Sequence, residues 1–208
     1  MYSIAAVESG FTPAGFYAHE GFRDRILKSK PEVCDNFTVK HYKTYMDCFY
    51  NLNFGNKLTG FYMPLYADSP NDMYRWLECI CSDFSEAYLL LDEEGREIML
   101  RCHEKWNDKP YIRLTILSDE EKYYDPEQDK CVYNDRVEEL YRKTGNTQVI
   151  ADYMIKKETL IKEFMRETDA YLKSLTRADY GVVHAVRRLA IPHVRKFLKG
   201  LNNDIRHL

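Results

Sequence analysis

The stretch that decides the fold is AYLLLDEEGREIMLRCHEKWNDKPYIRLTIL, residues 87–117. It contains three segments rich in apolar residues, 87–91, 97–106 and 111–117, and the last two alternate apolar with polar side chains. The tetrapeptides EEGR and NDKP separate these segments and have the composition of turns. Short turns between segments with a period of two predict an antiparallel β meander.

The sequence on either side of the meander predicts further strands and helices. Residues 57–66 have strand composition, and residues 132–133 predict a short edge strand. A Ser-Pro pair at 69–70 is a typical helix start, and apolar residues over 73–84 then recur on one helical face. Residues 39–50 also have helical spacing. We therefore expect a four-stranded, mostly antiparallel sheet with flanking helices.

The last third of the chain has the periodicity of helices. A short helix should end at Gly145, because glycine accepts the left-handed conformation of a helix C-cap. Apolar residues then recur at helical spacing over 149–175 and again over 182–201. The expected fold class is α+β, with an α+β body at 1–134 that includes an acidic meander, and a helical section at 135–208 with a basic C-terminal end.

Length and composition set broad limits on the class of protein. A chain of 208 residues can form one domain, or one domain with a helical appendage. No run approaches the roughly 18 apolar residues of a membrane span, and the N-terminus lacks the basic start of a signal peptide. We expect no membrane span and a cytoplasmic location. The six cysteines include no Cys-x-x-Cys pair, so we expect buried free thiols, no metal and no cofactor.

Charge is distributed unevenly along the chain. Residues 68–139 contain 20 Asp/Glu against 9 Lys/Arg, a net charge of −11. Residues 173–208 contain 8 Lys/Arg against 2 Asp/Glu, a net charge of +6. Such separation points to an electrostatically guided partner, which we expect to be nucleic acid or a basic nucleic-acid-binding protein. The oligomeric state stays open.

The segment GNTQVIADYMIKKETL, residues 145–160, resembles a bacterial helix-turn-helix. The resemblance implies that its third helix enters the major groove of DNA. The residues it would place against bases or phosphates are Lys156, Lys157, Thr159 and Lys162. Such motifs usually have a glycine in the turn, and here none separates Met154 from Ile155. The alternative is one continuous helix over 149–175.

The basic C-terminal end predicts a phosphate-binding helix face. In a helix over 182–201, basic residues lie opposite the apolar stripe. The candidate residues are Arg187, Arg188, Arg195, Lys196 and Lys199. The leading hypothesis is therefore a non-enzymatic, intracellular regulatory or interaction protein whose C-terminal helical section contacts nucleic acid.

The acidic middle of the chain supports an alternative hypothesis. Carboxylates arranged on a rigid meander can imitate a phosphate backbone, as small inhibitors from phage and mobile elements do. The protein would then occupy the basic, nucleic-acid-binding groove of a partner. The candidate residues are Asp92, Glu93, Glu94, Glu97, Asp119, Glu120 and Glu121.

A third hypothesis is enzymatic. The spacing of Arg177 and His184 is similar to that of the Arg-His pair in helical RNases of the HEPN type. The resemblance implies metal-independent RNA cleavage, in which the histidine polarises a 2′-hydroxyl and the arginine stabilises the phosphorane charge. The strand-rich first half does not suit a helical bundle, so we expect no catalytic residues.

Overall fold

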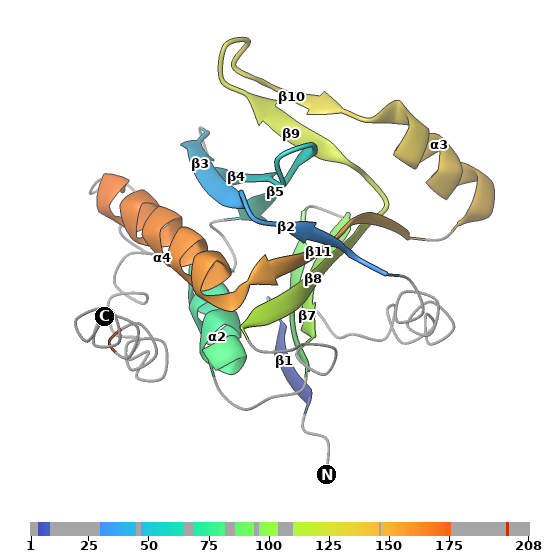
Figure 1. Ribbon diagram of the computed structural model, residues 1–208. Coiled ribbons are helices and arrows are strands. Elements are labelled where there is room, and N and C mark those ends of the chain that lie inside the picture. Colours follow the sequence, from blue (N-terminus) through green and yellow to red (C-terminus); the bar gives the residue numbers. More distant parts are fainter. Residues whose placement is uncertain are drawn as a thin grey trace.

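The computed structural model describes residues 4–8, 30–44, 47–64, 69–81, 86–93, 96–103, 110–145, 147–175 and 199. Within these ranges the chain is α+β, as expected, and forms two sheets with three helices (Figure 1). The expectation of a single four-stranded sheet is wrong, because one sheet has six strands and the other has five.

The six-stranded sheet, sheet A, has the meander at its centre. Residues 87–117 form three consecutive antiparallel strands, which confirms the prediction for this stretch. The strand order is β1-β6-β7-β8-β11-β2, and both edge strands run parallel to their neighbours. The strands of sheet A are β1 (Ile4–Glu8), β6 (Glu86–Asp92), β7 (Glu97–His103), β8 (Tyr111–Ser118), β11 (Gln148–Lys156) and β2 (Glu32–Cys34).

The five-stranded sheet, sheet B, is antiparallel throughout, in the order β10-β9-β5-β4-β3. The helix expected over 39–50 is wrong, because residues 39–43 lie in β3 and residues 47–50 lie in β4, and the two strands pair antiparallel. Both faces of β4 are buried, so its apolar residues do not alternate cleanly. The strands are β3 (Thr38–Lys43), β4 (Asp47–Asn53), β5 (Leu58–Pro64), β9 (Lys122–Asp125) and β10 (Lys130–Tyr133).

The helix-turn-helix interpretation of residues 145–160 is wrong. Residues 148–156 are strand β11, which pairs with β8 on one side and β2 on the other. A bulge between Val149 and Ala151 shifts the register, and Ile150 and Ala151 are therefore both buried. Two adjacent buried residues break the period of two and imitate helical spacing. The continuous helix over 149–175 is wrong for the same reason.

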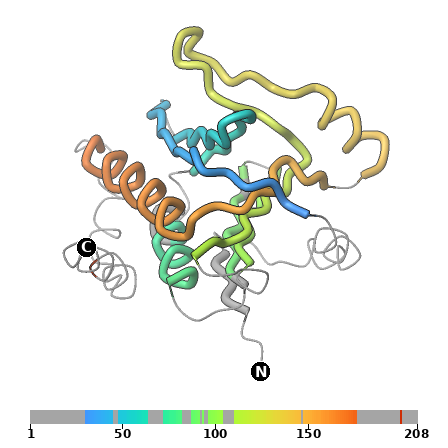
Figure 2. Tube along the Cα trace, viewed as in Figure 1, coloured from blue at the N-terminus to red at the C-terminus, as the bar shows by residue number. Residues whose placement is uncertain are grey.

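Three helices flank the sheets within the described residues. Helix α2 (Ser69–Cys81) begins at the expected Ser-Pro pair, and α3 (Asp135–Thr144) ends at Gly145, whose φ of 63° is left-handed. Helix α4 (Lys157–Ser174) follows β11 directly. The tube in Figure 2 shows α4, in orange, beside the blue strand β3 from near the start of the chain.

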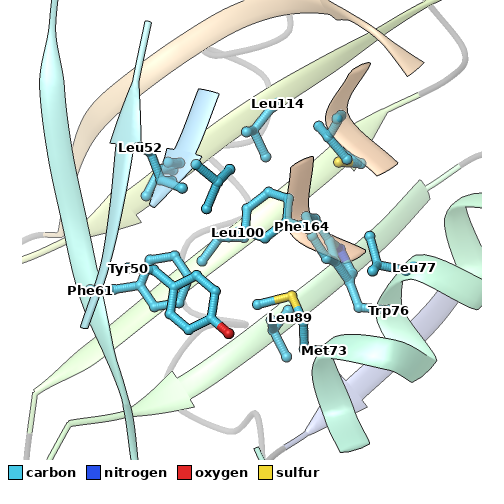
Figure 3. Packing of buried hydrophobic residues seen from close by; sticks show 14 of the residues in the cluster. Tyr50, Leu52, Phe61, Met73, Trp76, Leu77, Leu89, Leu100, Leu114 and Phe164 are labelled. Atoms are coloured by element: carbon cyan, nitrogen blue, oxygen red, sulfur yellow. The ribbon is translucent and has the colours of Figure 1, made fainter. Parts of the chain in front are cut away.

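The core lies between the two sheets and helices α2 and α4. The rings of Trp76 on α2 and Phe164 on α4 meet edge to face with centroids 5.3 Å apart. Tyr50 and Phe61 of sheet B stack 5.5 Å apart in the same cluster (Figure 3). Aromatic pairs of this kind add to the free energy gained from burial. The core therefore fixes α4 against both sheets.

Polar side chains of α4 close the outer edge of β3. Glu163 accepts a hydrogen bond from the main-chain N–H of Val39 at 2.9 Å, and Glu167 accepts one from that of His41 at 3.1 Å. Arg166 donates to the carbonyl oxygen of Val39 at 3.1 Å. We call Glu163, Arg166 and Glu167 the edge clamp. They occupy the main-chain groups that another strand would otherwise bind.

The edge clamp should make stability depend on pH through Glu167. Burial raises the pKa of Glu167, but hydrogen bonds from His41 and Arg166 outweigh it and lower the pKa overall. A carboxyl whose pKa falls on folding stabilises the fold above its unfolded pKa, and this contribution is lost as pH falls through the folded pKa. Glu167→Gln should therefore lower the free energy of unfolding by about 1 to 3 kcal/mol at pH 7. Below about pH 4 the difference from the natural chain should shrink.

Urea unfolding of both chains at several pH values measures this difference. Glu158→Gln is the matched control, because Glu158 pairs with Lys162 on the exposed side of the same helix. This control should change the free energy of unfolding by less than about 0.5 kcal/mol. An equal loss for Glu167→Gln at neutral and acid pH would contradict the role of the carboxylate.

Candidate functional site

The predicted nucleic-acid residues within β11 and α4 lie around the start of α4. Lys156 is the exposed last residue of β11, and Lys157 and Thr159 are half-buried in the first turn of the helix. Lys162 is exposed and pairs with Glu158 one turn earlier. The structure thus places these residues at a strand–helix junction rather than on a recognition helix.

The predicted residues of the C-terminal end fall almost wholly outside the described residues. This applies to Arg187, Arg188, Arg195 and Lys196, and to the pair Arg177 and His184. Lys199 is described and is exposed.

The predicted acidic residues do not form one exposed surface. Glu94 lies outside the described residues, and Asp92 is the last residue of β6. Glu97 and Asp119 are half-buried. The side chains of the remaining three are buried, namely Glu93, Glu120 and Glu121.

The buried carboxylates surround Lys122. Its ammonium lies 2.7 Å from a Glu93 oxygen and 2.9 Å from a Glu120 oxygen, and all three side chains are less than one-tenth exposed. The second oxygen of Glu93 accepts the main-chain N–H of Tyr62 on β5. Burial lowers the pKa of Lys122, but the two carboxylates outweigh burial and raise it overall. We call Glu93, Glu120 and Lys122 the ionic joint, because they connect the β6–β7 turn of sheet A to sheet B.

Two further cations extend the ionic joint. The Arg96 guanidinium lies 3.7 Å from Glu120 and 3.6 Å from Glu138 of α3. Glu121 pairs with Lys57 at 2.8 Å and also accepts from the side-chain amide of Asn134. These contacts hold β9 and α3 against the body, so Glu93, Glu120 and Glu121 of the predicted acidic residues serve internal attachment.

A phenol and a thiol lie beside the ionic joint. The Tyr62 hydroxyl is 2.7 Å from the Cys131 sulfur, and the Lys122 ammonium lies 4.8 Å from the centre of the Tyr62 ring. Burial raises the pKa of both Tyr62 and Cys131, so both are protonated at neutral pH. A protonated, half-buried thiol is a poor nucleophile. This arrangement favours packing over catalysis.

Close approach of β4 to β5 at Gly60 shapes this region. An added Cβ at Gly60 would lie 2.2 Å from the Tyr50 carbonyl oxygen and 2.5 Å from the Phe49 ring. The missing side chain lets the Phe49 ring lie over β5, where it meets Tyr62 edge to face and also contacts Tyr124. The sequence signal for this site was therefore a glycine within a strand.

A second buried polar group lies on sheet A, on the face away from α2 and α4. Arg113 donates two hydrogen bonds to Asp152, at 2.7 and 2.6 Å, and Thr115 donates a third at 3.1 Å. The Arg113 side chain is 1% exposed. Alternation along β8 predicts that Arg113 and Thr115 share a face, but Asp152 was expected in a helix. These hydrogen bonds join β8 to β11.

Several exposed acidic residues lie at the end of sheet B opposite β3. We call β9, β10 and α3, residues 122–144, the arm; it consists of the last two strands of sheet B and the helix that follows them (Figure 1). Helix α3 has no buried residue. Exposed carboxylates on the arm belong to Glu127, Asp129, Asp135 and Glu139. Tyr133 and Leu140 are exposed as well.

No cofactor or membrane feature emerges from the described part of the chain. Its His, Cys, Asp and Glu side chains form no group of three that could hold a metal ion. None of its helices combines the length and the apolar character needed to cross a membrane. Comparison of the chain with protein-family models, with curated proteins and with solved structures gives no match.

Removing the cation of the ionic joint should be strongly destabilising. Lys122→Met would leave Glu93 and Glu120 buried without their ammonium partner. We expect a loss of about 3 to 5 kcal/mol in the free energy of unfolding. The triple variant Lys122→Met, Glu93→Gln, Glu120→Gln should recover much of that loss, because no uncompensated charge remains.

Urea unfolding measures these losses, with Lys130→Met as the matched control at an exposed position of the arm. The control should stay within about 0.5 kcal/mol of the natural chain. A triple variant less stable than Lys122→Met would show that the ionic joint is not held by charge compensation.

Proposed function

We propose that this chain is a cytoplasmic, non-enzymatic regulatory or interaction protein whose C-terminal section contacts nucleic acid. The observation that carries the proposal is the net charge of +6 over residues 173–208, which directly follow most of α4. Positive charge of this density attracts phosphates and releases their counterions on binding.

The environment of α4 supports this proposal. Its acidic residues have partners within the protein: Glu158 pairs with Lys162, Glu163 and Glu167 belong to the edge clamp, and Asp169 accepts from the Tyr74 hydroxyl. Negative charge next to the basic end is therefore largely balanced. Lys156 remains exposed on the same part of the chain and would add to the attraction.

Charge neutralisation in the full chain tests the nucleic-acid proposal. Changing Arg187, Arg188, Arg195, Lys196 and Lys199 to Gln should weaken binding to a mixed-sequence duplex on the order of 100-fold at low salt. The slope of log K against log salt should fall by about 0.9 for each phosphate that the variant no longer neutralises. Fluorescence anisotropy with labelled DNA and RNA duplexes measures both quantities.

The control carries the same change of charge elsewhere: Lys30, Lys40, Lys43, Lys130 and Lys143 to Gln, all exposed positions. Its affinity should fall far less. Equal weakening of both variants would show that only net charge matters. Absence of binding by the natural chain at low salt would refute the proposal.

A second candidate function is binding of a basic protein through the acidic region 68–139. The observation that favours it is the set of exposed carboxylates on the arm. Because the side chains of Glu93, Glu120 and Glu121 are buried, we place this contact on the arm and not at 119–121. A basic nucleic-acid-binding groove would attract such a surface and associate quickly at low salt.

Recovery of partners from nuclease-treated lysate tests the second candidate. The natural chain should retain a basic protein, and Glu127→Lys with Glu139→Lys should lose it because both positions are exposed on the arm. The control Glu158→Lys introduces the reversed charge on α4. Recovery that requires intact nucleic acid, or that survives reversal on the arm, would count against this candidate.

A further inference from the structure

The two edges of sheet B differ in whether the outward main-chain groups have hydrogen-bond partners among the described residues. At β3 the edge clamp occupies the outward main-chain groups of Val39 and His41. At the other edge, β10 pairs with β9, and besides that pairing no hydrogen bond joins the main chain of residues 130–133 to another described residue. In an antiparallel edge strand, alternate residues point their N–H and C=O groups outward. The outer side of β10 therefore resembles the edge of a sheet that accepts another strand.

Exposure and position make this edge accessible. β10 is the outermost strand of sheet B at the end opposite β3 (Figure 1), with Lys130 and Tyr133 exposed and Cys131 and Val132 half-buried. The Cys131 sulfur faces the Tyr62 hydroxyl of β5, and this contact helps to fix the strand. The ionic joint holds β9 at its start. A rigidly held strand loses little conformational freedom when it pairs with a partner.

Charge indicates the chemistry of the partner. Residues 125–139 contain six Asp/Glu against two Lys/Arg, and Lys130 is the one cation within β10. Glu127 and Asp129 lie at the turn before β10, and Asp135 and Glu139 lie beyond its other end. Carboxylates at both ends of a short edge favour an extended segment with basic side chains.

We propose that the outer edge of β10 binds an extended, lysine- or arginine-rich segment of a partner protein by strand addition. The proposal rests on the second candidate function, because it names where on the acidic region the partner binds and in which conformation. Main-chain hydrogen bonds to β10 supply the binding geometry. The flanking carboxylates supply selectivity for basic segments.

The test uses the full chain and two peptides of alternating lysine and valine, one of them N-methylated at every residue, so that neither edge of that peptide retains an N–H donor. N-methylation removes outward N–H donors and leaves the charge unchanged. The unmodified peptide should slow hydrogen exchange of alternate amides within residues 130–133 by about tenfold or more, with β3 amides unchanged. The methylated peptide should have no such effect.

Neutral variants separate charge from strand pairing. Glu127→Gln combined with Glu139→Gln should weaken binding of the unmodified peptide to the chain about threefold or more. The control Glu158→Gln on α4 should leave this binding unchanged. Equal binding of the two peptides would overturn strand addition while leaving charge-driven partner binding in place. No slowing of β10 amides by the unmodified peptide would also overturn it, and the lysate experiment then decides the second candidate independently.

Discussion

The whole fold depends on helix α4 being held by both sheets at once. It continues directly from β11 of sheet A, and its buried residues Leu160, Ile161 and Phe164 lie in the common core. On its polar side the edge clamp supplies hydrogen bonds to β3 of sheet B. Helix α4 thus contributes side chains to the core, connects sheet A to sheet B, and covers the edge of β3 where a further strand would otherwise pair. The ionic joint makes a second connection between the sheets, from the β6–β7 turn to β9.

The sequence predicted the elements that have clear turn or cap residues at their ends. Residues 87–117 are three apolar segments separated by EEGR and NDKP, and α2 has a conventional start at Ser69 and Pro70. Residues 148–156 and 39–50 were wrongly assigned to helices. A bulge in the first segment and burial of both faces in the second removed the period of two. Local patterns do not contain this information, because it arises from strands far away in the chain.

Composition predicted that the chain contains a strongly acidic region, but it did not predict where the individual acidic residues lie in the fold. The counts of Asp and Glu indicated an acidic region, and the exposed carboxylates of the arm belong to it. Nothing local distinguishes Glu93, which is buried against Lys122, from Glu127, which is exposed. The difference comes from the pairing of β9 with β5, which brings Lys122 to Glu93. Arg113 and Asp152 likewise meet only because β11 pairs with β8.

The edge clamp also has a consequence for synthesis of the chain on the ribosome. The His41–Glu167 contact spans 126 residues, so β3 emerges long before the helix that closes its edge. At roughly 5–20 residues per second, this interval is on the order of ten seconds. During that time the β3–β4 hairpin presents an unprotected edge to other nascent chains and to chaperones. The docking of α4 on β3 therefore ends this period of exposure.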